Sequence, residues 1–181
     1  MKNILLILTT AFVCACQDKD PKRIPATSTT DSIKRDTSEK AKIGTFTTRY
    51  NFDSFHVTIY KGKLAAPNFS KNPFAGDSLY VNFITKGCSS NGINFGGHYT
   101  IIHKGCGTMC EHIFIVDRIN GKIFTDTKPN DGRYGFAYKK DSRLLIANSN
   151  SFIDESFTRY ATVFDTPELY KWTGTDFLQL K

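Results

Sequence analysis

Residues 98–117, HYTIIHKGCGTMCEHIFIVD, constrain the fold most, because two strand-like runs flank one short, glycine-bearing turn. The runs 99–104 and 112–117 are rich in β-branched and aromatic residues, a composition typical of strands. So few residues separate them that the second run must return antiparallel beside the first. The sequence therefore predicts a β-hairpin whose tip lies between Cys106 and Cys110.

The rest of the chain from residue 43 onward repeats this pattern of short aromatic-rich runs between turn signals. Fifteen Phe and eight Tyr against two Met favour strands over helices. We expect strands at 45–52 and 55–63, a strand–turn–strand unit in 134–149, and another in 161–181 with Thr173-Gly174-Thr175 at its tip. Asn120-Gly121 is the pair best suited to a two-residue turn, so a second hairpin should follow the first.

Residues 77–87, DSLYVNFITKG, fit two periodicities. Leu79, Val81 and Phe83 fit the two-residue period of a strand, whereas Leu79, Phe83 and Ile84 fit one face of a helix. The predicted fold is mainly β, an antiparallel meander that forms an open sheet or a sandwich, with room for one helix.

The N-terminus reads as an export signal. Residues 1–15 carry one charge at Lys2, an apolar stretch and then small residues, which is typical of a secretory signal too short to span a bilayer. The ending VCAC resembles a bacterial lipobox, so we expect cleavage after Ala15 and lipidation of Cys16. The alternative is an ordinary secreted protein that is cut nearby and carries no lipid.

Residues 16–42 follow as a tether rich in Ser, Thr, Pro, Asp and Lys, with too little apolar surface to offset the entropy of ordering. Residues 43–181 have the size of one domain with one core. The expected location is the bacterial cell envelope, with the lipid on Cys16 holding the chain to the outer membrane.

Three cysteines remain once Cys14 leaves with the signal and Cys16 is lipidated. Cys106 and Cys110 are four residues apart across a turn, within reach of a disulfide, and an exported chain meets oxidising conditions. We favour this pair, and the alternative joins Cys88 to one of the two. At least one of the three thiols stays unpaired within the monomer.

Three of the four histidines lie in the same window as the cysteine pair. Along an extended segment His103 shares a face with Tyr99, while His98 points to the other face, which argues against a metal site that uses both. His112 could meet either one, depending on register. Zinc or copper bound by Cys106, Cys110 and a histidine is an alternative, but C-x₃-C is not the usual zinc spacing, so we predict no metal and no cofactor.

A second chemical alternative makes Cys106 or Cys110 a thiolate nucleophile assisted by His98, His103 or His112. Backbone amides of the glycine-bearing turn would then form an oxyanion pocket. Such a thiolate needs a nearby cation to lower its pKa, and Lys104 is the only candidate in the sequence nearby.

Residues 94–124 resemble the central motif of a group of small exported bacterial proteins of unassigned function. The shared pattern is N-F-[AG]-G-H-Y, then G-C-G-x-x-C, then I-[IV]-D before a G-K turn, and it includes Gly97, His98, Tyr99, Cys106 and Cys110. The chain departs from this pattern at His103-Lys104 and in carrying Cys88. The resemblance implies that the motif is the working or structural centre of the domain, and it supplies no reaction.

The net charge of the chain excludes few classes of binding partner. The formal charge of +7 falls to +6 when Lys2 leaves with the signal, and the basic residues form no run, so we expect no nucleic-acid partner. We expect a module that binds an envelope protein or a small ligand through His98, Tyr99 and the cysteine tip. The alternative is a cysteine- and histidine-dependent hydrolase or thiol-redox enzyme on the same residues.

Overall fold

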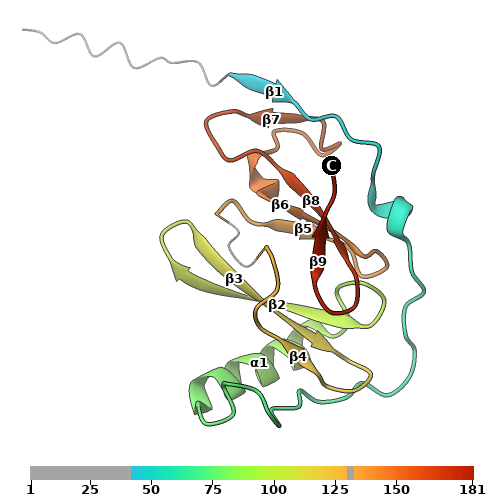
Figure 1. The fold of residues 1–181 in the computed structure, drawn as a ribbon, viewed down its shortest axis with the longest axis vertical. Coiled ribbons are helices and arrows are strands. Elements are labelled where there is room, and N and C mark those ends of the chain that lie inside the picture. Colours follow the sequence, from blue (N-terminus) through green and yellow to red (C-terminus); the bar gives the residue numbers. More distant parts are fainter. Residues whose placement is uncertain (1–41, 130–132) are drawn as a thin grey trace, which may run out of the picture. The chain divides into compact units, whose positions relative to one another are not determined.

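The computed structural model describes residues 42–129 and 133–181, and the predicted signal, Cys16 and the tether up to residue 41 lie outside this part. The prediction of a mainly β, antiparallel fold is confirmed: the described residues form open sheets with one α-helix (Figure 1). Two sheets carry most of the structure, in the strand orders β2-β3-β4 and β5-β6-β8-β9. In the described part of the chain, no helix has the length and apolar character needed to cross a membrane.

The predicted hairpin is confirmed as β2 (Tyr99–Gly107) and β3 (Cys110–Asp117). Its register places Tyr99 opposite Asp117, and it shifts at a bulge near the tip. β4 (Ile123–Phe124) extends the sheet as the second hairpin. The expected two-residue turn is wrong, because five residues, 118–122, join β3 to β4. Bonds from Asp117 N to Lys122 O and from Gly121 N to Asp117 O close this loop.

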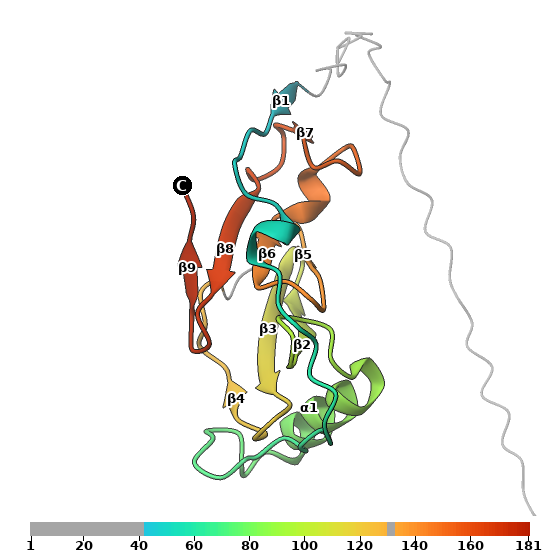
Figure 2. The ribbon, with the colours of Figure 1, turned by 90° about the vertical axis from the view of Figure 1, so that its right-hand side faces the viewer.

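The hairpin is buried on both faces. One face, with Tyr99 and Ile101, packs against residues of the second sheet that include Trp172. The other face, with Ile102 and Phe114, packs against the helix. Figure 2 shows the helix and strands β8 and β9 on opposite sides of the hairpin. Burial on both faces explains why the sequences of these strands are continuous apolar runs and do not alternate between apolar and polar residues.

The ambiguous segment forms the helix α1 (Ser78–Asn91). The Asp77 side chain accepts bonds from Leu79 N at 2.9 Å and Tyr80 N at 3.2 Å, which caps the first turn. Ile84 and Cys88, one turn apart, face the hairpin and are buried. The capping residue and this spacing decide between the two periodicities in favour of the helix.

The second sheet contains β5 (Phe136–Tyr138), β6 (Leu144–Ala147), β8 (Glu168–Trp172) and β9 (Phe177–Gln179). Both predicted strand–turn–strand units are thereby confirmed. A separate pair joins β1 (Ile43–Thr45) to β7 (Arg159–Ala161).

The two strands predicted nearest the start of the domain are largely wrong. β1 ends at Thr45, and Phe52–Phe55 forms a 3₁₀-helix capped by reciprocal bonds between Asn51 and Ser54. Residues 57–63 have no regular structure, apart from backbone bonds such as Tyr60 N to Gly97 O at 2.8 Å. Aromatic residues of 46–55 instead cover the outer face of the second sheet, where they pack around Leu144, Ile146 and Leu169: Phe46, Tyr50, Phe52 and Phe55. Their apolar character serves packing, not strand pairing.

Candidate functional site

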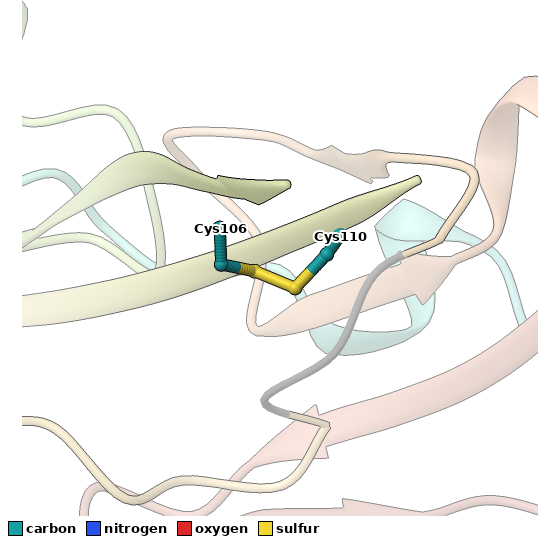
Figure 3. The surroundings of a disulfide bond; sticks show 2 residues. All are labelled: Cys106 and Cys110. Atoms are coloured by element: carbon teal, nitrogen blue, oxygen red, sulfur yellow. A yellow bond between two sulfur atoms is a disulfide. The ribbon is translucent and has the colours of Figure 1, made fainter. Parts of the chain in front are cut away.

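The tip of the β2–β3 hairpin carries the predicted disulfide. Cys106 and Cys110 are bonded, with their Cα atoms 5.1 Å apart, across the bulged end of the hairpin (Figure 3). Residues 105–109 are exposed, and the Met109 side chain is 50% accessible. The sulfurs therefore close a turn that stands in solvent while the strands below it are buried.

Cys88 is a free thiol on α1, so the alternative pairing of Cys88 with a tip cysteine is wrong. Its side chain is 2% exposed and packs with Ile84 and Ile102. Burial raises the pKa of the Cys88 thiol, and the positive charge of Arg118 opposes this effect only in part. A buried thiol with a raised pKa is a poor nucleophile.

His103 joins the hairpin to the second sheet through a chain of polar groups. Its Nε2 lies 2.7 Å from the Tyr138 hydroxyl, and its Nδ1 lies 3.0 Å from Glu111 Oε1. Burial, aided by the Glu111 charge, raises the pKa of Tyr138 to about 12. Since the phenol stays protonated, it can donate to Nε2 in the tautomer of His103 that carries its proton on Nδ1, and that Nδ1–H then donates to the Glu111 carboxylate.

This chain of groups could share a proton, but its geometry serves chiefly to fix the tip. Glu111 follows Cys110 directly and lies opposite Gly105 in the register. Sequence reasoning singled out His103 but neither of its partners. Glu111 could have been found from the hairpin register, whereas Tyr138 lies on a strand of the other sheet, which no local pattern connects to His103.

His112 is the histidine that lies beside the disulfide. It pairs with Lys104 across the hairpin, and one of its ring nitrogens lies within 4.8 Å of both tip sulfurs. Two thiolates and an imidazole are a ligand set for zinc or copper, but only after reduction, because disulfide sulfurs are not thiolates. The Lys104 ammonium lies 4.8 Å from the centre of the Tyr80 ring, so it is directed toward α1.

His98 and Tyr99 lie at the other end of the hairpin from the tip. Tyr99 and Cys106 are seven positions apart along an extended strand, a distance of about 23 Å. The residues expected to form one binding surface are thus divided between the two ends. Tyr99 is 5% exposed and packs edge-on against Trp172 in the core, which leaves little of its ring for a ligand.

His98 is half-buried beside Asp117, with 3.9 Å between its Nε2 and Asp117 Oδ1. Burial lowers the pKa of His98, and it outweighs the opposing effect of Asp117. The imidazole is therefore neutral at physiological pH. It lies against the Tyr99 ring, with 4.1 Å between the ring centres and 34° between the ring planes. A neutral imidazole could bind a proton donor here.

The NFGG part of the motif is architectural. The Asn94 amide brackets Ile101, since its Oδ1 accepts from Ile101 N at 2.7 Å and its Nδ2 donates to Ile101 O at 2.9 Å. These two bonds satisfy the backbone N–H and C=O of Ile101 on the free edge of β2, as a residue of a neighbouring strand would. Gly97 has a φ of 87°, and a β-carbon there would lie 2.7 Å from Thr58 O. Only glycine fits this approach of two backbones.

Arg118 is a buried residue that sequence reasoning missed. It is 6% exposed, and its Nη1 donates to Cys88 O at 2.7 Å and to Thr100 Oγ1 at 3.1 Å. Its Nε donates to Ala65 O at 3.0 Å. One guanidinium therefore ties the helix, β2 and the segment before α1 together at the base of the hairpin.

Comparison with known proteins gave no relative. No family model, no curated protein and no solved structure matches the chain.

Proposed function

We propose that the protein is a lipid-anchored protein of the bacterial cell envelope whose β domain binds a partner through the oxidised hairpin tip. The observation that carries this proposal is the contrast at the tip: residues 105–109 are exposed, yet a disulfide closes the turn. The partner is an envelope protein or a small ligand.

A rigid exposed tip suits binding better than a mobile one. Ordering a loop when it binds reduces affinity, and a tip that is already fixed avoids that loss. Two features hold this one: the disulfide across the turn, and the contact of His103 with Tyr138 on β5. Met109, half exposed at the apex, supplies an adaptable apolar contact.

The sequence of residues 1–42 supports the proposed location. A cleaved signal at 1–15, lipid on Cys16 and a polar tether would hold the domain near the outer membrane with freedom to reach a partner. Mass spectrometry of the mature protein tests this part by itself. We expect an N-terminal Cys16 that carries acyl chains, and an unmodified N-terminus contradicts the anchor.

Photo-crosslinking tests the role of the tip. A benzophenone amino acid replaces Met109 in one full-length variant and Leu178 on β9 in another, since these side chains are 50% and 57% exposed. We expect a discrete adduct in envelope preparations from position 109 and none from position 178. The adduct should disappear when Cys106 and Cys110 are both replaced by serine. Equal adducts from both positions, or an adduct that survives loss of the disulfide, contradict the proposal.

The second candidate is a thiol-redox enzyme or a cysteine hydrolase. One observation favours it: Cys106 is exposed, and a His112 nitrogen lies within 4.8 Å of both sulfurs. A substrate thiolate would attack one sulfur, displace the other as a thiolate and form a mixed disulfide, with His112 supplying the proton for the leaving sulfur.

The two candidates differ in the state of the thiols. The binding module keeps both tip cysteines oxidised and unreactive in the purified protein. The enzyme shows, after mild reduction, one readily alkylated thiol with an apparent pKa well below that of free cysteine, about 8.5. Non-reducing mass spectrometry, followed by alkylation rates across pH, separates the two. Metal analysis of the reduced protein tests zinc or copper binding by Cys106, Cys110 and His112.

A further inference from the structure

A surface pocket lies beside the β3–β4 loop, at the end of β3 opposite the disulfide tip. Its volume is about 420 Å³, and its walls come from two segments, 68–72 and 120–123. Pockets for small molecules usually start at about 300 Å³. The pocket is thus large enough for a ligand of monosaccharide or amino-acid size, and the proposed function does not involve it.

Backbone contacts hold the two walls in place. Asn68 N donates to Gly121 O at 2.7 Å, and Ala65 N donates to Arg118 O at 2.8 Å. Gly121 has a φ of 79°, and a β-carbon there would lie 2.2 Å from Ala66 O. These contacts fix the pocket before any ligand arrives, which reduces the entropy lost on binding.

Asparagine side chains give the pocket hydrogen-bond donors. Asn68 Oδ1 accepts from Ser70 N at 2.9 Å, and Asn72 Oδ1 accepts from Phe74 N at 3.0 Å. Because each amide oxygen is turned toward its own backbone, each NH₂ group is turned the other way. Both residues line the pocket, so these NH₂ groups can donate to a ligand there while the two Oδ1 bonds stay in place.

The charged residues that line the pocket are all positive. Lys71 and Lys122 line it, and none of its lining residues is Asp or Glu. The nearby Asp117 carboxylate is occupied, since it accepts bonds from Ile119 N and from the Asn120 amide. Lys71 also keeps a left-handed backbone, with a φ of 64°, where residues with a β-carbon are strained. Such strain is often found at binding sites.

We propose that this pocket binds a small anion through a carboxylate or phosphate group. Lys71 and Lys122 supply the positive charge, although the Lys122 ammonium lies 4.7 Å from the centre of the Phe124 ring and has to turn from it to reach the anion. The NH₂ groups of Asn68 and Asn72 supply hydrogen bonds to the anionic oxygens. The inference needs neither the lipid anchor nor the disulfide tip, so its failure leaves the proposed function standing.

Titration of the ¹⁵N-labelled full-length protein, followed by NMR at constant ionic strength, tests the proposal. The probes are inorganic phosphate, D-glucuronate and, as a neutral control, D-glucose. We expect saturable shifts of the side-chain NH₂ signals of Asn68 and Asn72 with at least one anion and none with glucose. A response to phosphate alone assigns a phosphoryl ligand, and a response to glucuronate alone assigns a carboxylate sugar. Shifts that do not saturate, or that glucose also produces, overturn the proposal.

Asn72→Asp is the most informative variant. It keeps the oxygen that accepts from Phe74 N and replaces the donor with a negative charge, so the loop stays capped while the anion is repelled. We expect saturable binding to disappear. Lys139→Ala is the control, because Lys139 lies over the Phe52 ring and does not line the pocket. If Asn72→Asp binds as the parent protein does, the pocket is not the site.

Lys71→Gly separates binding from folding. Glycine relieves the left-handed strain at this position and removes one ammonium group. We expect anion affinity to fall by roughly tenfold while thermal stability is kept or raised. Unchanged affinity in this variant removes Lys71 from the site and contradicts the proposal.

Discussion

The two ends of the β2–β3 hairpin are held by different means. At the base, Arg118 and Asn94 bond to backbone carbonyls, and the core residues around Tyr99 are buried. At the tip, the backbone is exposed and a disulfide joins Cys106 to Cys110. The base is held by burial and hydrogen bonds, whereas the tip needs a covalent bond because it has no core.

This difference indicates that the base and the tip of the hairpin contribute unequally to the stability of the domain. A base packed between α1 and the second sheet sets the stability of the domain, since each residue removed there leaves a cavity or an unpaired polar group. The tip should add less to stability, and in the proposed function it keeps its shape for contact with a partner. Four substitutions, from the largest expected effect to the smallest, test this division.

The largest effect should come from Gly121→Ala at the base. A β-carbon there would lie 2.2 Å from Ala66 O, at a φ of 79°. Clash and strain together should lower the free energy of unfolding by about 3 kcal/mol or more. Urea unfolding measures the loss. Gly92→Ala is the matched control, since Gly92 has a φ of 57° with nothing within 4 Å of the added carbon. An equal loss in both variants would remove the Ala66 contact from the explanation.

Removal of the disulfide should have the next largest effect. Replacement of Cys106 and Cys110 by serine opens a very small loop, so the free energy of unfolding should fall by about 2 kcal/mol. The β core should persist, with hydrogen exchange increased only in the turn. Cys88→Ser is a contrasting variant, because it places a hydroxyl in the buried contact of α1 with Ile102. Loss of the whole fold on opening the disulfide would contradict the division between base and tip.

The parts of the fold that were predictable are those with local signals. The β2–β3 hairpin follows from two apolar runs around a short turn, and its disulfide follows from the spacing of Cys106 and Cys110. The strands expected at 45–52 and 55–63 were wrong, because aromatic residues cover a sheet face as readily as they form a strand. Composition alone does not distinguish these two outcomes.

The site was predictable only in part, because its partners come from distant strands. His103 was singled out, but Tyr138 lies 35 positions away in the chain on the facing sheet. The division of His98 and Cys106 between the two ends could have been derived from strand length alone. The pocket at the β3–β4 loop depends on the docking of residues 66–72, and the sequence of that segment carries no such signal.

Tyr138→Phe should have a smaller effect at the tip. Loss of the hydroxyl that is hydrogen-bonded to His103 Nε2 should lower the free energy of unfolding by about 1 kcal/mol at neutral pH. A double-mutant cycle with His103→Gln should show coupling of similar size.

The pH dependence sharpens this test. The pKa of Tyr138 is raised to about 12 in the folded state, from about 10 in the unfolded chain. The folded state therefore holds the proton more tightly, and the contribution present below pH 10 is lost as the pH rises toward 12. The stability difference between the parent protein and Tyr138→Phe should shrink over this range. A constant difference would mean that the phenol does not titrate as the geometry implies.

The smallest effect should come from His98→Gln at the base. Burial lowers the pKa of His98 in the folded state, below the value of about 6.5 in the unfolded chain. The unfolded chain therefore binds the proton more readily, so stability present above pH 6.5 declines as the pH falls through the folded pKa. The variant should lack this decline, a difference of a few tenths of a kcal/mol that unfolding curves between pH 7 and 5 can detect. His56→Gln is the control. A His98→Gln curve as steep as that of the parent would show that Asp117, rather than burial, governs this histidine, and that the base is more polar than its packing indicates.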